Sequence, residues 1–365
     1  MRVDIGVFAH NEAQGIADMV ARLLAQDLGG LEARILVLAN GCTDATADLA
    51  RAAGAEVADL AEGGKSRTWN RFVHGLARAE AEVLIFVDAD IEFTAPDCLK
   101  RLALGLVERP ELWVLNSQPV KDIVARPVGL GALDKIIAAA GGGLDEWKTA
   151  ICGQLYAMPA ARARSLHLPI GLPVEDGFLR AMVLTDALTG PEEFSRIDGL
   201  DGLSHVYASE RRIAALIRHQ TRIVIGSAIN FAAFEALRGL PGPERRAELM
   251  RAAADEGWLV RAIRARLPSW PFGYVPLHFL TKRLVRLASH PRDLFRPKRV
   301  FVPSWALALT RLFTFWRSIA WRAGRGRGTG RPDCLFSPPI SGETMAKMGH
   351  CPQAMHFPYP PRLWV

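Results

Sequence analysis

The first 117 residues alternate between short apolar runs and longer stretches with one apolar face. The runs at residues 3–9, 34–39 and 83–87 are almost entirely apolar, which is typical of strands covered on both faces. The stretches between them carry apolar residues three and four positions apart, the spacing of a helix with one buried face. With further strands near residues 55–58 and 112–117, the alternation predicts βαβ units and a mainly parallel sheet.

The same spacing predicts where helices begin and which of their residues are buried. Thr43 or Asp44 is expected to cap the second helix, and Pro96 is expected at the first position of the fourth. The expected buried faces are Ile16, Met19, Val20, Leu23 and Leu24 in the first helix, Trp69, Phe72, Val73 and Leu76 in the third, and Leu99, Leu102 and Leu106 in the fourth.

The pattern becomes less regular after residue 120. A strand is expected at residues 151–158, and the apolar stretch after residues 173–176 is expected to be a helix. Residues 205–235 are interpreted as one Arg-rich helix and one separate apolar segment. The residues from 324 onward begin with repeated Gly and Arg and are then rich in Pro, a composition typical of an irregular or disordered tail.

Composition indicates a basic surface and a reducing compartment. The chain has 365 residues and a formal net charge of +7, and Arg is concentrated between residues 261 and 331. A basic stretch interleaved with aromatic residues indicates an anionic lipid or a nucleic acid as partner, although a solvated basic face has the same composition. The five cysteines form no CxxC pair, which favours a reducing compartment and argues against structural zinc.

Two amphipathic stretches in this basic region indicate contact with a membrane surface. Residues 305–319 place Leu309, Leu312 and Trp316 on one helical face and Arg on the other, and residues 277–288 repeat the arrangement. Helices of this kind lie in the plane of an anionic membrane. The alternative is that both pack on the α/β domain. Neither a signal peptide nor a conventional spanning helix is expected.

Three polar motifs directly follow three of the predicted strands. They are Asn11-Glu12, Asn40-Gly41-Cys42-Thr43-Asp44 and Asp88-Ala89-Asp90. Ligands of parallel sheets bind at the carboxyl ends of the strands, so the shared location indicates a site. Two carboxylates at such an end suit Mg²⁺ or Mn²⁺, hard ions that usually share their oxygen ligands with a substrate diphosphate. A turn or helix-cap role is the alternative interpretation of the Asp pair.

Two further motifs add basic and acidic groups. Gly63-Gly64-Lys65-Ser66-Arg67 is a Gly-rich turn before a helix, and its backbone N–H groups and Lys suit a phosphate. An ordinary capped loop is the alternative there. Glu175-Asp176 follows a Pro-bounded loop, and a carboxylate at this position is either a general base or a group that stabilises the start of a helix.

In this order the motifs resemble the family 2 glycosyltransferases, whose core is the GT-A fold, over about residues 3–222. The matching segments are His10-Asn11-Glu12, Asn40 to Asp44, Gly64-Lys65 to Asn70, Asp88-Ala89-Asp90, Gly153-Gln154-Leu155-Tyr156 and Glu175-Asp176. There are two departures. Asn40 stands where the family usually has an acid, and the Gln-x-x-Arg-Trp motif of processive synthases is absent. Residues 218–222 are a loose substitute for that motif that could touch the diphosphate.

The resemblance implies an inverting transfer from a nucleoside-diphosphate sugar with Mn²⁺ or Mg²⁺. Asp176 is the implied catalytic base, with Glu175 beside it, and Asp90, aided by Asp88, is the implied metal ligand. The implied donor-binding residues are Ala9, Asn11, Glu12, Asn40, Lys65, Asn70, Asp88, Ala89, Asp90 and Arg222.

These inferences divide the chain into a catalytic GT-A domain (residues 1–235), a helical amphipathic region (236–323) and a tail (324–365). We expect a metal-dependent hexosyltransferase, cytoplasmic and peripheral on the inner face of the cell membrane. Its expected acceptor is a lipid or lipid-linked glycan of bacterial envelope or glycolipid biosynthesis, and no nucleic acid partner is expected. Two alternatives stay open: a nucleotidyltransferase, and a non-catalytic sugar-nucleotide-binding protein at a membrane.

Overall fold

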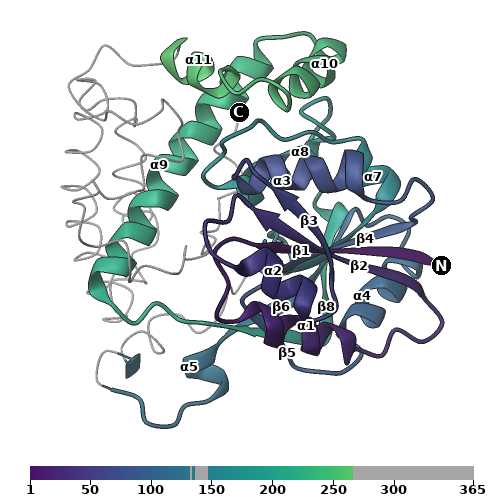
Figure 1. Ribbon diagram of the computed structural model, residues 1–365. Helices are drawn as coiled ribbons and strands as arrows, with labels where there is room; N and C mark the ends of the chain where they lie inside the picture. The colour runs from purple at the N-terminus through teal and green to yellow at the C-terminus, as the bar shows by residue number, and fades with distance from the viewer. Residues whose placement is uncertain (132–133, 136–146, 266–365) are drawn as a thin grey trace, which may run out of the picture.

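A computed structural model describes residues 1–131, 134–135 and 147–265, and an eight-stranded mixed sheet forms their centre (Figure 1). The strand order is β3-β2-β1-β4-β7-β6-β8-β5. The strands are β1 (Arg2–Ala9), β2 (Glu32–Asn40), β3 (Glu56–Leu60), β4 (Val83–Asp88), β5 (Ile91–Phe93), β6 (Val114–Lys121), β7 (Leu155–Pro159) and β8 (Ile197–Tyr207).

Helices cover both faces of this sheet. They are α1 (Ile16–Leu24), α2 (Thr46–Ala52), α3 (Lys65–Arg71), the π-helix η1 (Phe72–Leu76), α4 (Cys98–Val107), α5 (Asp122–Ala125), α7 (Ala160–Arg164), α8 (Glu175–Thr185), the 3₁₀ turn η2 (Phe194–Arg196), α9 (Ile213–Arg238), α10 (Gly242–Ala252) and α11 (Trp258–Ala265). In Figure 1, α1, α2 and α4 lie on one side of the sheet, and α3, α7 and α8 lie on the other.

The sheet has a parallel half and a mixed half. Strands β3, β2, β1 and β4 are all parallel, so the ends of β1, β2 and β4 reach the same edge of the sheet. Strand β7 runs antiparallel between β4 and β6, β6 and β8 are parallel, and β5 is antiparallel to β8. The predicted α/β fold with a mainly parallel sheet flanked by helices is confirmed.

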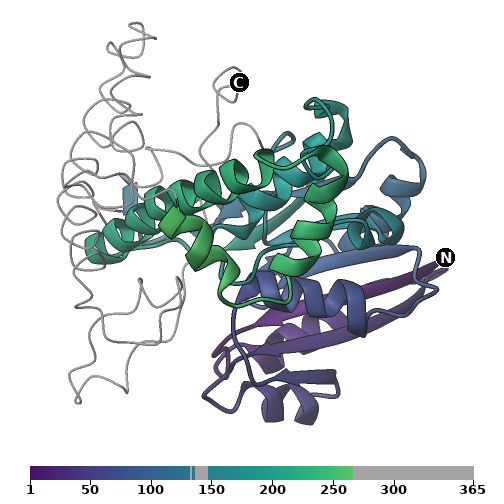
Figure 2. The same cartoon turned by 90° about the horizontal axis from the view of Figure 1, so that it is seen from above.

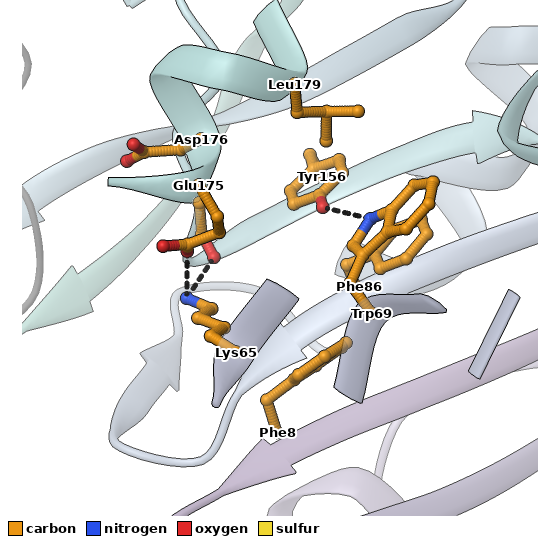
Figure 3. A pocket seen from close by; sticks show the side chains of 9 residues that line it. Phe8, Lys65, Trp69, Phe86, Tyr156, Glu175, Asp176 and Leu179 are labelled. Atoms are coloured by element: carbon orange, nitrogen blue, oxygen red, sulfur yellow. Dashed lines mark hydrogen bonds and ion pairs between the residues drawn. The ribbon is translucent and has the colours of Figure 1, made fainter. Parts of the chain in front are cut away.

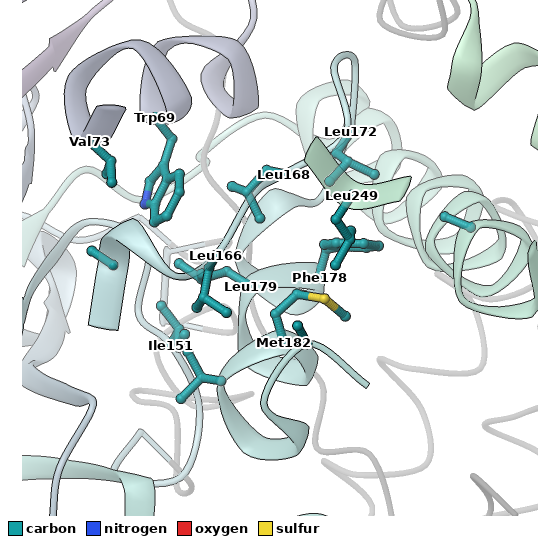
Figure 4. Close-up of a cluster of buried hydrophobic side chains, with 14 of the residues drawn as sticks. Trp69, Val73, Ile151, Leu166, Leu168, Leu172, Phe178, Leu179, Met182 and Leu249 are labelled. Carbon is teal, nitrogen blue, oxygen red and sulfur yellow. The ribbon is translucent and has the colours of Figure 1, made fainter. Parts of the chain in front are cut away.

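Two apolar clusters hold the layers together. One lies beneath α1, α2 and α4 and includes Ile5, Met19 and Leu102, which are buried. The other joins the opposite face of the sheet to α3, α8 and α10. Figure 4 shows Trp69 of α3, Phe178 of α8 and Leu249 of α10 in this second cluster. Burial of apolar surface contributes about 25 cal/mol per Å², and this stabilises the packing of the helices on the sheet.

Most elements predicted before residue 117 are confirmed, with small shifts at their ends. Leu24, which was expected on the buried face of the first helix, is the last residue of α1 and is 60% exposed. The predicted position of Pro96 is wrong, because α4 begins at Cys98 and the Pro96 carbonyl instead accepts a hydrogen bond from the Asp27 N–H at 2.6 Å. The N-cap of α2 is Ala45 rather than the predicted Thr43 or Asp44, although Asp44 Oδ1 accepts a hydrogen bond from the Thr46 N–H at 3.1 Å.

The region after residue 205 differs from the prediction. Residues 213–238 form one helix of 26 residues rather than a helix and a separate apolar segment. Its apolar residues are distributed around the helix because it packs against several neighbours, which removes the amphipathic signal that marks surface helices. Strands β5 and β8 were not predicted, since β5 is only three residues long and β8 contains Gly199 and Gly202.

The described part of the region beyond residue 235 packs on the rest of the protein. Figure 2 shows α10 and α11 against α9, and their residues Leu249, Trp258 and Leu259 belong to the second apolar cluster. The amphipathic stretches at residues 277–288 and 305–319 and the predicted tail lie outside the described residues. Within the residues that the structure describes, no helix combines the length and the hydropathy needed to cross a membrane.

Candidate functional site

The loops that follow β1 and β2 are tied to each other at the carboxyl edge of the sheet. Asn11 has a φ of 57°, and its Oδ1 accepts a hydrogen bond from the Thr43 N–H at 2.8 Å. The Glu12 N–H donates to the Thr46 hydroxyl at 2.8 Å. A left-handed backbone at Asn11 turns the chain sharply after β1. Two of the predicted motifs therefore form one surface.

Asn40 connects the end of β2 to the Gly-rich turn before α3. Its Oδ1 accepts hydrogen bonds from the Gly64 N–H at 2.8 Å and from the Thr68 hydroxyl at 2.9 Å. Gly41 has a φ of +58°, and a Cβ there would lie 2.6 Å from the Gly63 backbone. Only glycine fits this close approach. The amide that replaces the usual acid thus holds the loop that carries Lys65.

The Lys65 ammonium group joins three elements of the site. Its Nζ lies 2.8 Å from Asp88 Oδ2 at the end of β4, 3.0 Å from the Gly153 carbonyl oxygen, and 3.4 Å from Glu175 Oε1 at the start of α8. Figure 3 shows Lys65 and Glu175 facing each other across the pocket. The structure therefore brings together motifs that lie between residues 65 and 175 of the sequence.

Charge at this point is dominated by carboxylates. Burial lowers the pKa of Lys65, but the negative charges of Asp88 and Glu175 outweigh burial and hold the pKa above its ordinary value. Burial raises the pKa of Asp88, Lys65 opposes this, and the charge of Asp90 adds to it. Around Lys65 the carboxylates therefore outnumber the cation, and a divalent ion relieves such an excess of negative charge.

Asp88 and Asp90 are the predicted ligands of a divalent cation. Asp88 is buried and Asp90 is partly exposed at the end of β4. Within residues 1–131, 134–135 and 147–265, no group of three or more His, Cys, Asp or Glu side chains is placed to hold a metal ion. Mg²⁺ is commonly held by one or two carboxylates together with substrate phosphates and water. The donor set fits a metal that binds with its substrate.

Asp176 lies beside this group at the start of α8. Its side chain is buried, and its Oδ1 accepts a hydrogen bond from the Gly177 N–H at 2.7 Å. A Cβ at Gly153 would lie 3.4 Å from the Asp176 Cβ and 3.7 Å from Lys65 Nζ. Glycine at residue 153 therefore leaves the space between the acid and the lysine open.

An aromatic floor closes the pocket beneath these charges. Its lining residues are Phe8, Lys65, Trp69, Phe86, Gly153, Tyr156, Glu175, Asp176 and Leu179 (Figure 3). The Phe86 and Tyr156 rings are stacked at 4.6 Å, and the Trp69 indole N–H donates to the Tyr156 hydroxyl at 3.1 Å. Stacking and this hydrogen bond fix the floor in place. The sequence identified Trp69 as a buried residue but did not indicate this pocket.

His205 supports the end of β4 from inside the sheet. Its Nδ1 lies 3.0 Å from the Ser117 hydroxyl and its Nε2 lies 2.9 Å from Gln154 Oε1, while the Gln154 carbonyl accepts from the Asp88 N–H at 2.8 Å. Burial lowers the pKa of His205 to about 3, so the ring is neutral. Both ring nitrogens have protein partners, which indicates a structural role.

The remaining predicted donor-binding residues have different surroundings. Ala9 and Ala89 are buried at the ends of β1 and β4 and lie close to the site through their backbones. The hydrogen bonds of the Asn70 side chain join it to Leu168 rather than to the group around Lys65. Its Nδ2 donates to the Leu168 carbonyl oxygen at 2.7 Å, and its Oδ1 accepts from the Leu168 N–H at 3.0 Å. Its contacts are those of a residue that anchors a loop. Arg222 lies on α9.

The fold and this polar edge define an α/β protein with a candidate site at the carboxyl ends of its parallel strands. Residues 4–123 match the family model described as Glycosyl transferase family 2. The predicted resemblance to that family, with its GT-A fold, is therefore confirmed. No curated protein matches the sequence.

Solved structures similar to this chain are glycosyltransferases. The mannosyltransferase PcManGT from Pyrobaculum calidifontis, in complex with GDP-Man and Mn²⁺, is 18% identical with a TM-score of 0.51, over 88% of this chain and 87% of that chain. Glucosyl-3-phosphoglycerate synthase from Mycobacterium tuberculosis, in complex with Mn²⁺, UDP-glucose and phosphoglyceric acid, is 18% identical with a TM-score of 0.45, over 66% of this chain and 80% of that chain. At these identities the likeness to the first structure concerns the fold.

Proposed function

We propose that the protein transfers a sugar from a nucleoside-diphosphate sugar to a hydroxyl group of an acceptor, with inversion at the anomeric carbon. The observation that carries this proposal is the convergence of Asp88, Lys65, Glu175 and Asp176 around one pocket at the carboxyl edge of the sheet. The family match supports glycosyl transfer, and inversion follows from the resemblance to family 2.

The donor is proposed to lie along the ends of β1, β2 and β4. Asn11, Glu12 and Asn40 border the nucleotide there, and Lys65 faces the diphosphate. Asp90 and Asp88 would hold Mn²⁺ or Mg²⁺. When bound, such an ion neutralises charge that develops on the departing diphosphate. Backbone groups of Ala9 and Ala89 complete this edge.

Asp176 is proposed to remove the proton from the acceptor hydroxyl. The hydroxyl oxygen forms the new bond to the anomeric carbon as the bond to the diphosphate oxygen breaks, and the nucleoside diphosphate leaves with that electron pair. Attack opposite the leaving group inverts the anomeric configuration. Glu175, 3.4 Å from Lys65 Nζ, keeps the lysine oriented within the site. A general base at this point contributes roughly 100- to 10,000-fold to the rate.

The nature of the acceptor and the location of the protein stay proposals from the sequence. A lipid or lipid-linked acceptor and a peripheral position on the inner face of the membrane rest on residues 277–288 and 305–319. The donor is proposed to be a hexose nucleotide, and the GDP-Man and UDP-glucose complexes of the similar structures make those two donors the first to test.

The test is nucleotide release from UDP-, GDP- and dTDP-sugars with Mn²⁺, with and without membrane lipid extract. Release from one donor, lost in Asp90→Ala, is the expected result. Turnover of no donor would contradict the proposal and favour a sugar-nucleotide-binding protein. Pyrophosphate release from a nucleoside triphosphate would instead establish a nucleotidyltransferase.

A further inference from the structure

The side chain of Arg67 lies buried between two carboxylates from distant parts of the chain. Arg67 is in the first turn of α3, two residues after Lys65, and its side chain is only 7% exposed. Its Nη1 pairs with Glu62, just before the Gly-rich turn, and its Nη2 lies 2.5 Å from Glu256 Oε1, in the turn between α10 and α11. Its Nε–H has no acceptor among the residues that the structure describes. The two carboxylates therefore orient the guanidinium group.

Burial gives these two ion pairs more weight than an exposed pair has. An exposed pair such as Arg251 with Glu248 on α10, where the arginine is 71% exposed, is screened by water and contributes little. A buried guanidinium that loses a carboxylate keeps its charge away from water, which is unfavourable. Arg67 therefore restrains both carboxylates, although Glu62 is 56% exposed and Glu256 is 42% exposed.

Glu256 belongs to a turn that is itself well anchored. Asp255 Oδ1 accepts a hydrogen bond from the Gly257 N–H at 2.8 Å, and Trp258, the first residue of α11, is buried in the second apolar cluster. In Figure 1, α10 and α11 lie on the side of the sheet that α3 and α8 cover. This turn therefore gives Arg67 a fixed point outside α3.

The segment at residues 62–64 has more conformational freedom to lose. It contains two consecutive glycines, and Gly64 has a φ of +123°, a conformation that other residues rarely adopt. The Gly64 N–H donates to Asn40 Oδ1 at 2.8 Å, which holds one end of the segment. Glu62, through Arg67, holds the other end. Lys65 follows directly, so the order of this segment determines where Lys65 begins.

We propose that Arg67 is a positioning residue that links the turn between α10 and α11 to the segment that places Lys65 at the donor diphosphate. Glu256 orients Arg67, Arg67 holds Glu62, and Glu62 fixes the segment at residues 62–64. The two helices thereby support the donor site, although the described pocket is lined by none of their residues. The inference rests on the proposed function. Because the contacts act in series, breaking a second link should add little to breaking the first.

The first test is amide hydrogen exchange of the full-length protein without nucleotide or metal. The Gly64 N–H is protected by its bond to Asn40, so its exchange reports on the order of the segment. We expect exchange in a peptide covering residues 61–66 to accelerate about fivefold in Glu256→Gln, as for loss of about one hydrogen bond. A peptide from β1 should exchange as in the parent protein. Unaltered exchange at residues 61–66 would overturn the link.

The second test is the affinity for UDP and for GDP, each with Mn²⁺, measured by titration calorimetry. The Kd should rise about tenfold in Arg67→Met and in Glu256→Gln, as for loss of a charged hydrogen bond. The double variant Glu62→Gln/Glu256→Gln should bind about as weakly as Glu256→Gln alone. Arg67→Lys keeps the charge and should restore part of the affinity. Arg251→Gln removes an exposed pair on α10 and is the matched control.

Three binding results would overturn the proposal. Normal affinity in Glu256→Gln would confine Arg67 to α3, and additive losses in the double variant would show that the two carboxylates act separately. A smaller binding-competent fraction at unchanged Kd, with lower thermal stability, would assign a purely structural role. Glu256→Gln decides the question even where Arg67→Met does not fold. If the parent protein bound neither nucleotide, the proposed function would fail, and hydrogen exchange would still decide whether the link exists.

Discussion

The two halves of the site are built differently. The half formed by β1, β2 and β4 consists of parallel strands whose polar residues follow directly in the sequence, as in Asp88-Ala89-Asp90. In the half formed by α8 and α9, contacts join segments far apart in the sequence, as in the hydrogen bond from Asn230 Nδ2 to the carbonyl oxygen of Val174, 56 residues away. The first half carries an excess of acids around Lys65, and the second holds the proposed base at the start of α8.

This difference separates two tasks in the proposed reaction. An acidic edge suits a metal ion that accompanies a diphosphate, and the start of α8 presents Asp176 to the acceptor hydroxyl. Asp176 lies where the halves meet, and Gly153 leaves space between it and Lys65. Changes in the two halves should therefore affect donor binding and proton transfer separately.

The largest effect is expected at the residue that the halves share. Asp176→Asn replaces the proposed base by an amide that accepts no proton, so kcat should fall by about 100- to 10,000-fold. The donor Kd should stay nearly unchanged, because the side chain keeps its size. Steady-state kinetics and donor titration measure the two quantities. Glu175→Gln is the neighbouring control with a smaller expected loss, and normal turnover in Asp176→Asn would refute the base assignment.

The next effect isolates the acidic half. Asp90→Ala should reduce metal-dependent nucleotide release by at least about 100-fold, since a metal supplies several kcal/mol of charge stabilisation. A chelator should reduce release by the parent protein to a similar level, and Mn²⁺ should restore it. Asp48→Ala removes an acid that is 85% exposed and serves as the control. Equal metal dependence in Asp90→Ala and the parent would place the ion elsewhere.

A pair of glycine substitutions compares the packing of the halves. A Cβ at Gly6 in β1 would lie 2.8 Å from the Phe72 ring, and a Cβ at Gly226 in α9 would lie 2.3 Å from Val174 Cγ2. Overpacking should lower the free energy of unfolding by about 1–3 kcal/mol in Gly6→Ala. In Gly226→Ala the better helix propensity of Ala offsets about 1 kcal/mol of that loss.

Urea unfolding measures both changes, and steady-state kinetics separate them. Gly226→Ala should lower kcat because it shifts α9 against α8, the helix that carries Asp176, whereas Gly6→Ala should leave kcat nearly unaltered. The opposite pattern would show that the packing of α9 does not position the start of α8.

The smallest effect at neutral pH concerns His205, which lies between the halves. The pKa of His205 is about 3 in the folded protein, below the ordinary value of 6.5. Between these values the unfolded chain binds a proton that the folded chain excludes. The free energy of unfolding should therefore rise with pH by about 1.4 kcal/mol per unit across that window and level off above it.

Denaturant unfolding between pH 3 and 8 measures this slope. His205→Gln should make it shallower by about one proton, and His219 contributes with the same sign, since its pKa of about 4 is also lowered. An unchanged slope in His205→Gln would mean that the ring is already protonated in the folded state near pH 5.

Local sequence patterns were sufficient to predict the half of the site that the parallel strands β1, β2 and β4 form. The apolar runs of β1, β2 and β4 and the faces of α1 and α3 follow from residue spacing, and the motifs that end these strands could be placed at one edge because parallel strands end together. The prediction failed at Pro96, where a tertiary hydrogen bond to Asp27 replaced the expected helix start. It also failed for α9, whose many packing partners remove a single apolar stripe.

Residue order was enough to predict the α/β alternation, the GT-A resemblance and the identity of the acidic motifs, because these depend on short-range periodicity and on neighbouring residues. Three-dimensional packing was needed to show that Lys65 lies between Asp88 and Glu175, that Asn70 binds Leu168, and that α9 packs against the residue before α8. Such contacts depend on how the helices pack on the sheet. Packing is a long-range property, set by the shapes of many buried side chains at once.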